Sequence, residues 1–174
     1  SCATAILKRQ DVIKNEISED LTIVGFSSTG KAAYEAAENS GIGSNGLTSA
    51  RHELLSNFYR EKYPETTDFS IDPALSYCGR WRLEDQLPLT SMTIGSALLS
   101  PTRTYAPLIA ALCSEFKDEI KGLVHCSGGG QTKCLRFGKN IHFVKDQLFE
   151  VPPLFGTIQL ASNTSWQEMY QTFN

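Results

Sequence analysis

The sequence lacks the features that would direct it to a membrane or to nucleic acid. Its apolar runs are far shorter than the roughly 20 residues that a membrane-spanning helix needs, and no signal peptide is visible. With 16 Lys and Arg against 19 Asp and Glu, the formal net charge is −3, which offers little attraction for phosphate backbones. We therefore expect neither nucleic acid nor a membrane as partner. A bound anion would have to be held locally, by loops and a few arginines.

Cysteine and histidine are scarce and scattered. The five cysteines form no CxxC pair, and the three histidines form no HxxxH pattern. These absences argue against a disulfide framework and against a zinc site, so the sequence predicts reduced thiols in a cytoplasmic protein and no metal ligands in this chain. Cys126 and Cys134 have no evident activating base in the sequence and are interpreted as small core residues rather than nucleophiles.

The composition that remains is that of one globular domain. The chain has 174 residues, of which 41% are hydrophobic and 20% charged, enough to bury a sizeable core. Strand and helix patterns alternate, which predicts an α+β fold with α/β-type layers. Strands are expected at residues 3–7, 21–26, 120–124 and 141–144. Helices are expected at residues 31–38, from 47 onward, 105–116, 152–160 and 166–172. Residues 63–88 contain several prolines and show no clear hydrophobic period, which indicates an insertion or a long excursion of the chain.

Three consecutive glycines, Gly128, Gly129 and Gly130, follow the expected strand 120–124 and His125. A turn without Cβ atoms can bring bare backbone N–H groups close to an anion, and a helix over residues 131–137 would add positive potential. The triplet therefore predicts a phosphate-binding loop, with an ordinary turn as the alternative. His125 is interpreted either as a hydrogen-bonded structural histidine or as a residue that faces the ligand.

Residues 25–31 resemble a nucleotide P-loop in spacing, but Ala32 stands where a Ser or Thr hydroxyl should bind magnesium. A plain strand-to-helix turn with an exposed Lys31 is the favoured interpretation. A second loop, Gly41-Ile-Gly-Ser-Asn-Gly46, leads into the helix that carries Arg51. Its N–H groups, with Ser44 and Asn45, could hold a phosphate or a carboxamide, or could simply cap the helix.

Taken in order, five segments resemble one family, the phosphoribosylformylglycinamidine cyclo-ligases, also called AIR synthetases. The family's C-terminal domain carries segments like GLHSNGYSLVR, PTRIY, HITGGG, PPIF and EEMYRTFN. The corresponding segments here are residues 41–51, 100–105, 125–130, 151–155 and 167–174. Five collinear matches are far more specific than any one of them, and they remove the need for a P-loop at residues 25–31.

The resemblance implies a fold and a reaction. The fold is that of the family's C-terminal domain, a mixed β-sheet between helices that is partly ferredoxin-like. In the reaction, a step of purine biosynthesis, ATP phosphorylates the amide oxygen of formylglycinamidine ribonucleotide. An internal nitrogen then closes the imidazole ring of aminoimidazole ribonucleotide, with release of ADP and phosphate. The implied substrate-binding residues are Ser44, Asn45, Gly46, Arg51, Thr102, Arg103, Gly128, Gly129 and Gly130, with His125 as the catalytic candidate.

Two departures from the family pattern shape the expectations. The family histidine before Ser-Asn-Gly is Gly43 here, so that position offers no side chain for acid–base chemistry. The family's N-terminal domain, which holds most of the ATP and Mg²⁺ residues, precedes the matched region and is absent from residues 1–174. The matched domain also stops short of the family's C-terminal end. We therefore expect a fragment that does not turn over ATP alone, and a full-length enzyme that pairs with its own N-terminal domain and forms a homodimer.

Two other interpretations stay open at this point. Sister families share the architecture, among them the formylglycinamide ribonucleotide amidotransferases and the selenophosphate synthetases. The Glu-Met-Tyr-Gln-Thr-Phe-Asn ending at residues 168–174 favours the cyclo-ligase. A non-catalytic ribonucleotide-binding module is the alternative from a different class, since Gly43 replaces the histidine.

Overall fold

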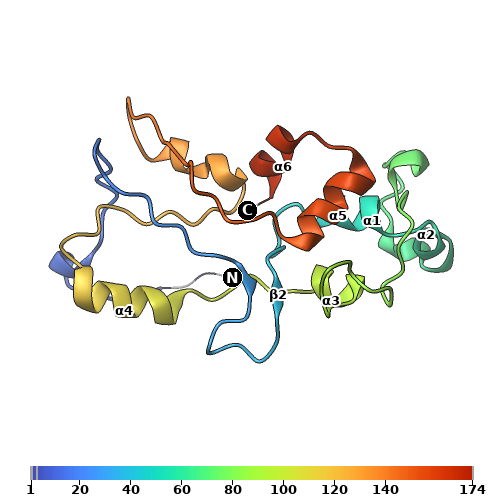
Figure 1. Ribbon diagram of the computed structural model, residues 1–174, viewed down its shortest axis with the longest axis horizontal. Helices are drawn as coiled ribbons and strands as arrows, with labels where there is room; N and C mark the ends of the chain where they lie inside the picture. Colours follow the sequence, from blue (N-terminus) through green and yellow to red (C-terminus); the bar gives the residue numbers. More distant parts are fainter. Residues whose placement is uncertain (1, 3, 174) are drawn as a thin grey trace.

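The computed structural model describes Cys2 and residues 4–173. The α-helices are α1 Leu47–Leu54, α2 Phe58–Lys62, α3 Ile94–Leu98, α4 Ala106–Phe116, α5 Pro153–Ser162 and α6 Trp166–Thr172. The 3₁₀ helices are η1 Arg9–Asp11, η2 Pro64–Thr66, η3 Pro73–Leu75 and η4 Gly130–Arg136. The strands β1 Thr29–Gly30 and β2 Asn39–Ser40 pair antiparallel. The chain is elongated, with α4 at one end and α1, α2, α3 and α5 toward the other (Figure 1).

The hydrophobic core lies among α1, α3, α5 and α6. Helix α1 packs against α5, and α6 packs against both α5 and η4. The largest fully buried apolar side chains are Ile42, Leu54, Leu87, Ile94, Leu154 and Ile158. The expected apolar face of α1 is confirmed: Ala50 and Leu54 are fully buried, and Leu47 and Phe58 pack against the core, although Phe58 belongs to α2. This core fixes the loops on either side of α1.

Local signals placed three other helices correctly. Helix α4 starts after Tyr105 with Pro107 in its first turn, and α5 starts at Pro153, where proline lacks the N–H that a helix start leaves unpaired. Ser165 caps α6, its hydroxyl oxygen accepting the backbone N–H of Glu168 at 3.2 Å.

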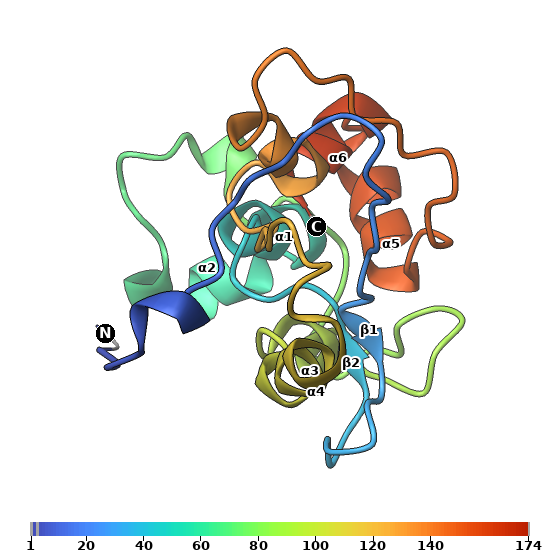
Figure 2. The same cartoon turned by 90° about the vertical axis from the view of Figure 1, so that its left-hand side faces the viewer.

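Helix α4 has no buried residue, so its apolar side is only partly covered. Viewed along the long axis, α4 and α3 overlap below the α1 region (Figure 2).

The structure corrects the expected sheet. An α+β arrangement is present, but the described sheet has two strands of two residues each, rather than a mixed sheet between helices. Residues 4–7, 21–26, 120–124 and 141–144 form no strand, and Ala3 lies outside the described residues. Apolar alternation favours an extended backbone, but a strand also needs a neighbour in register. Here residues 15–16 and 121–123 lie together through the Glu16 N–H to the Lys121 carbonyl, 2.8 Å, and the Asn15 side chain to the Leu123 backbone.

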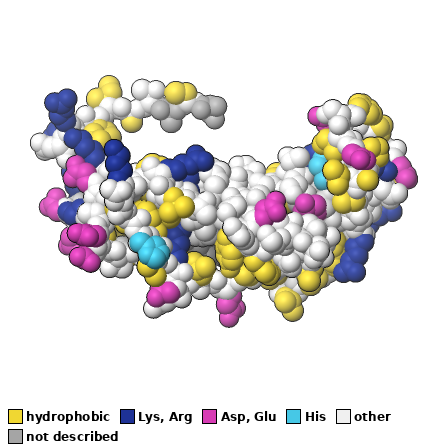
Figure 3. All heavy atoms as spheres, turned by 90° about the horizontal axis from the view of Figure 1, so that it is seen from above, with side chains coloured by type: hydrophobic (Ala, Val, Ile, Leu, Met, Phe, Trp, Pro, Cys, Tyr) yellow, Lys and Arg dark blue, Asp and Glu magenta, His cyan; other side chains and the backbone are white. Residues whose placement is uncertain are grey.

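Because these segments do not pair as strands of a sheet, many of their apolar side chains stay at the surface. Ile6 is 99% exposed and Val24 is 69% exposed. Hydrophobic side chains accordingly show in several separate places on the face seen from above (Figure 3). No helix among residues 4–173 is both long and apolar enough to cross a membrane.

Residues 31–38 also differ from expectation, because they form a bent connection between β1 and β2 instead of a helix. Glu35 turns back on its own backbone, its carboxylate accepting the Ala32 N–H at 2.8 Å. The β1–β2 pairing closes this connection and leaves no room for a straight helix. Residues 63–88, expected to be an insertion, contain two short 3₁₀ turns and contribute Tyr77 and Leu87 to the core. Two isolated β-bridges join this region to the residues that follow α1: Leu55 pairs with Trp81, and Ser56 pairs with Gly79.

Candidate functional site

One small pocket joins three of the motifs that the sequence singled out. It has a volume of about 40 Å³. It is lined by Ser28, Asn39, Gly41, Gly43, Ser44 and Asn45, by Pro101, Thr102, Arg103 and Tyr105, and by His125 and Ser127. The loop 41–46, the turn 101–103 and the segment before the glycine triplet therefore meet at one place, although they are far apart in sequence. Pockets that enclose a drug-sized ligand usually hold some 300–1,000 Å³, so this one could seat a group the size of a phosphate.

Buried polar side chains of β2 link the loop 41–46 to residues 97–101, which lead into the turn 101–103. The Asn39 amide donates to the Pro101 carbonyl at 2.8 Å, and its oxygen accepts the Gly41 N–H at 2.8 Å. The Ser40 hydroxyl donates to the Ala97 carbonyl at 2.6 Å, and the Ser40 N–H donates to the Ser100 hydroxyl at 3.0 Å. Both β2 side chains are buried and hydrogen-bonded, so they set the distance between the two loops. Sequence reasoning missed both residues.

Gly43 sits where the loop comes closest to the turn. Its φ is +52°, and a Cβ there would lie 3.0 Å from the Thr102 Oγ1. The family histidine at this position thus has no room here without a shift of Thr102, while Thr102 and Ser44 present hydroxyl groups to the pocket. Asn45 also lines the pocket, and its amide donates to the Thr172 carbonyl at the end of α6. Gly46 does not line it: with φ +73°, it lies against the ring of Phe173.

The three glycines of the triplet have different surroundings. A Cβ on Gly128 would meet nothing within 4 Å, whereas one on Gly130 would lie 2.5 Å from the carbonyl oxygens of Tyr170 and Phe173. Gly130 therefore packs against α6, and the open positions are Gly128 and Gly129. The expected helix after the triplet is present as η4, a 3₁₀ helix. Lys133 donates to the Gly128 carbonyl at 3.2 Å, which places an ammonium group beside this loop.

Arg103 lines the pocket, but its guanidinium is fully engaged within the chain. It makes five hydrogen bonds: two to the Glu35 carboxylate, and one each to the carbonyl oxygens of Ser27, Thr29 and Gly30. Since a guanidinium has five N–H donors, none is left over for a ligand. Glu35 was not predicted, because nothing in the sequence links it to a residue 68 positions away.

Arg51 lies outside the pocket. Its guanidinium carbon is 5.7 Å from the centre of the Tyr77 ring, and its Nη2 lies 3.4 Å from the His52 Nε2. His52 is 5% exposed, stands edge-on to Tyr77 and has its Nδ1 3.5 Å from the Ser76 hydroxyl. Arg51 therefore belongs to a polar cluster at the far side of α1, not to the site where the sequence had placed it. Burial, and then the charge of Arg51, lower the pKa of His52.

We expect the free energy of unfolding to decrease as the pH falls below the ordinary histidine pKa of 6.5, because of His52. Its pKa in the folded chain lies below the ordinary value of 6.5, so the unfolded chain takes up a proton first and folding is disfavoured as pH falls below that value. His52 contributes at most about 1.4 kcal/mol per pH unit to the slope of the free energy of unfolding against pH. Urea unfolding at pH 7.5 and 5.5 measures it. The variant His52→Gln should lose that part of the slope, and an unchanged slope would contradict the assignment.

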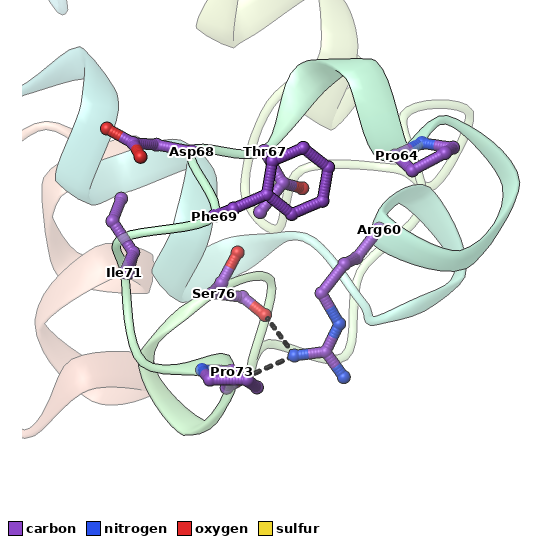
Figure 4. A pocket seen from close by; sticks show the side chains of 8 residues that line it. All are labelled: Arg60, Pro64, Thr67, Asp68, Phe69, Ile71, Pro73 and Ser76. Atoms are coloured by element: carbon purple, nitrogen blue, oxygen red, sulfur yellow. Dashed lines mark hydrogen bonds between the residues drawn. The ribbon is translucent and has the colours of Figure 1, made fainter.

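A second cavity lies apart from the motifs. Its volume is about 100 Å³, and it is formed by Arg60 of α2 and by residues between 64 and 76. Figure 4 shows Arg60 reaching toward Pro73 and Ser76, with its Nη1 donating to both backbone carbonyls, the one of Ser76 at 3.3 Å. Phe69 is another lining residue of this cavity, and its side chain is 86% exposed. Arg60 thus holds the loop 73–76 in place by hydrogen bonds to its backbone. We interpret this cavity as a result of how that loop packs rather than as a ligand site.

The donor set of the pocket does not fit a magnesium ion. Magnesium prefers carboxylate and water oxygens, and no carboxylate lines the pocket. Within the described part of the chain, no three His, Cys, Asp or Glu side chains gather as metal ligands would. Cys126 follows His125, and burial raises the pKa of its thiol, which disfavours the reactive thiolate.

A search for protein families found no family model that matches the chain. Curated proteins do match, and they are cyclo-ligases. Phosphoribosylformylglycinamidine cyclo-ligase of Methanococcus vannielii is 30% identical over 171 residues, which is 98% of this chain and 39% of that protein. The same enzyme of Methanopyrus kandleri is 32% identical over 142 residues, 82% of this chain and 34% of that protein. That of Methanobrevibacter smithii is 35% identical over 137 residues, 79% of this chain and 34% of that protein.

These matches confirm the family resemblance that the five motifs predicted. The chain is a homologue of the phosphoribosylformylglycinamidine cyclo-ligases. It spans about 39% of the length of the first curated relative.

Proposed function

We propose that this chain is the substrate-side part of a phosphoribosylformylglycinamidine cyclo-ligase, with a fold like the family's C-terminal domain. The pocket that joins loop 41–46 and turn 101–103 with His125 and Ser127 carries the proposal, since these residues belong to three of the family-like motifs and meet at one place. The curated relatives bear the name of that enzyme. The whole enzyme would close the imidazole ring of aminoimidazole ribonucleotide in purine biosynthesis, using ATP.

In this proposal the pocket holds the phosphate end of formylglycinamidine ribonucleotide. Ser44, Asn45 and Thr102 would supply polar groups from the pocket wall. Gly128 and Gly129 do not line the pocket; they follow Ser127, which does, and their backbone would supply N–H donors next to it. Lys133, beside the glycine loop, would add positive charge. His125 contributes an imidazole to the pocket wall and is the candidate for moving a proton at the closing ring.

ATP and Mg²⁺ would be bound mainly outside this chain. The pocket lacks carboxylates and is smaller than a nucleotide, so the remaining walls would come from the enzyme's N-terminal domain, within a homodimeric enzyme. The residues here would act by positioning the ribonucleotide rather than by handling the nucleotide triphosphate. A sister enzyme of the same superfamily would use the same pocket for another substrate.

Calorimetry with formylglycinamidine ribonucleotide tests the proposal, with ribose 5-phosphate and inorganic phosphate as simpler probes. Gly128→Val is expected to weaken binding by at least about tenfold, near 1.4 kcal/mol, because the added side chain stands where the phosphate would approach the backbone. Gly128 has no neighbour within 4 Å of a Cβ, so the fold should tolerate the change.

Gly156→Val is the matched control. Gly156 also has open space at its Cβ but lies in α5, which contributes no residue to the pocket, whereas Gly128 directly follows the lining residue Ser127, so affinity should stay the same. If the ribonucleotide binds both variants and the parent chain equally, the glycine loop is not its cradle. Turnover of ATP by residues 1–174 alone would contradict the assignment of ATP to another domain.

A further inference from the structure

The strongest polar arrangement beside the pocket is one that the proposed function does not use. Arg103 Nε donates to Glu35 Oε1 at 2.8 Å, and Nη2 donates to Glu35 Oε2 at 2.7 Å. Nη1 donates to the carbonyls of Ser27 and Thr29 at 2.8 and 3.0 Å, and Nη2 also reaches the Gly30 carbonyl at 2.9 Å. One side chain thus holds a carboxylate and three backbone carbonyl oxygens in the segment 27–35. Forked pairing of this kind is specific in geometry as well as strong.

Both partners are shielded from water. The side chain of Arg103 is 7% exposed and that of Glu35 is 16% exposed. The guanidinium of Arg103, followed by the Ala32 N–H, holds the pKa of Glu35 below its ordinary value. By contrast, the pair Lys117–Asp11 at the α4 end has side chains 38% and 42% exposed. The Glu35–Arg103 pair is therefore ionised and sheltered at neutral pH.

Few other contacts secure the segment 27–35 against the rest of the chain. The β1–β2 pairing covers two residues on each side. Tyr34 donates its hydroxyl to the Thr104 carbonyl at 2.8 Å, and Tyr105 donates to the Ser27 carbonyl at 3.3 Å. Ser28, near the start of this segment, lines the pocket. The position of that wall thus depends on the bonds that Arg103 supplies.

We propose that Glu35 and Arg103 form a positioning clamp that holds the turn 27–30 as a wall of the ribonucleotide pocket. Arg103 then acts through the turn and not as a ligand to the phosphate, because its donors are spent on residues 27–35. Glu35 is a positioning residue that touches no substrate. The affinity part of this inference rests on the proposed function, whereas the clamp itself concerns the chain alone.

The opposite arrangement makes a different prediction. If Glu35 were a stand-in for the ligand's phosphate, removing its charge would free Arg103 and tighten binding. If Glu35 is half of a clamp, removing its charge loosens the turn and weakens binding. The sign of the change in affinity therefore decides between the two.

Hydrogen exchange and calorimetry on the full 174-residue chain test the clamp. In Glu35→Gln the amides of residues 28–31 are expected to exchange at least about tenfold faster than in the parent, and ribonucleotide affinity is expected to fall at least about tenfold. Arg103→Lys should show the same faster exchange and weaker binding, since a lysine keeps the positive charge but cannot donate to both Glu35 oxygens as the planar guanidinium does. Saturating ribonucleotide should restore protection of residues 28–31 in Glu35→Gln, which a merely structural change elsewhere would not do.

Asp11→Asn is the matched control, because it removes the carboxylate of the exposed pair at the α4 end and should alter neither measurement. Unchanged exchange at residues 28–31 in Glu35→Gln, or tighter ribonucleotide binding, overturns the clamp. If the parent chain binds no ribonucleotide, the proposed function fails while faster exchange in Glu35→Gln still supports the clamp.

Discussion

Replacing Gly130 with alanine is expected to destabilise the folded chain by about 3 kcal/mol or more. The residue has φ +48°, a conformation that costs an L side chain energy, and its Cβ would stand 2.5 Å from the carbonyl oxygens of Tyr170 and Phe173. Those atoms are backbone at the end of α6, so relief requires α6 to move away from η4. Urea unfolding followed by tryptophan fluorescence measures the loss.

Gly128→Ala is the control within the same triplet. A Cβ there meets nothing within 4 Å, so the free energy of unfolding should change by less than about 0.5 kcal/mol. Equal losses in both variants would contradict the view that the third glycine serves packing and the first is open to a ligand.

The second large effect is expected for Ile158→Ala in α5. Ile158 is fully buried in the core, where α5 packs against α1. Truncation removes buried methyl groups and leaves a cavity, which usually costs about 2–5 kcal/mol. The midpoint of urea unfolding should fall accordingly, with little change in its slope.

Leu160→Ala provides the comparison on the same helix. Leu160 is 83% exposed, so the same kind of truncation should cost less than about 0.5 kcal/mol. A loss at Leu160 as large as that at Ile158 would mean that α5 presents a different face to α1 in solution.

Four of the described helices, α1, α4, α5 and α6, were predictable from the sequence because their signals are local, whereas α3 was not predicted. Apolar spacing located α1 and α4, and Pro153 and Ser165 marked the starts of α5 and α6. The strands were not predictable in this way, because a segment such as residues 21–26 can look like a strand yet find no neighbour in register. Residues 31–38 have helix-forming composition, but the capture of Glu35 by Arg103 and the β1–β2 pairing bend them.

The candidate site was predictable in outline and not in detail. Collinear motifs indicated that three loops belong together, and the pocket includes Ser44, Asn45, Thr102 and His125 from those loops. Arg51, Gly46 and the glycines 128–130 are not among its lining residues, and Arg103 is engaged with Glu35. Whether a given arginine faces a ligand or a carboxylate of its own chain depends on contacts between residues some 70 positions apart. Single residue types in a motif cannot specify such contacts.

The contact between residues 15–16 and 121–123 bears on the order in which the chain folds. The Asn15 side chain meets the Leu123 backbone across 108 residues of sequence, whereas α5 and α6 contact each other within about 20. Long loops close slowly, because their entropy is lost before the distant contact forms. We therefore expect α5 and α6 to pair first, because α1 and α5 are themselves separated by about 100 residues of sequence. His125 lies two residues beyond Leu123, so its side of the pocket would be completed after the α5–α6 pair has formed.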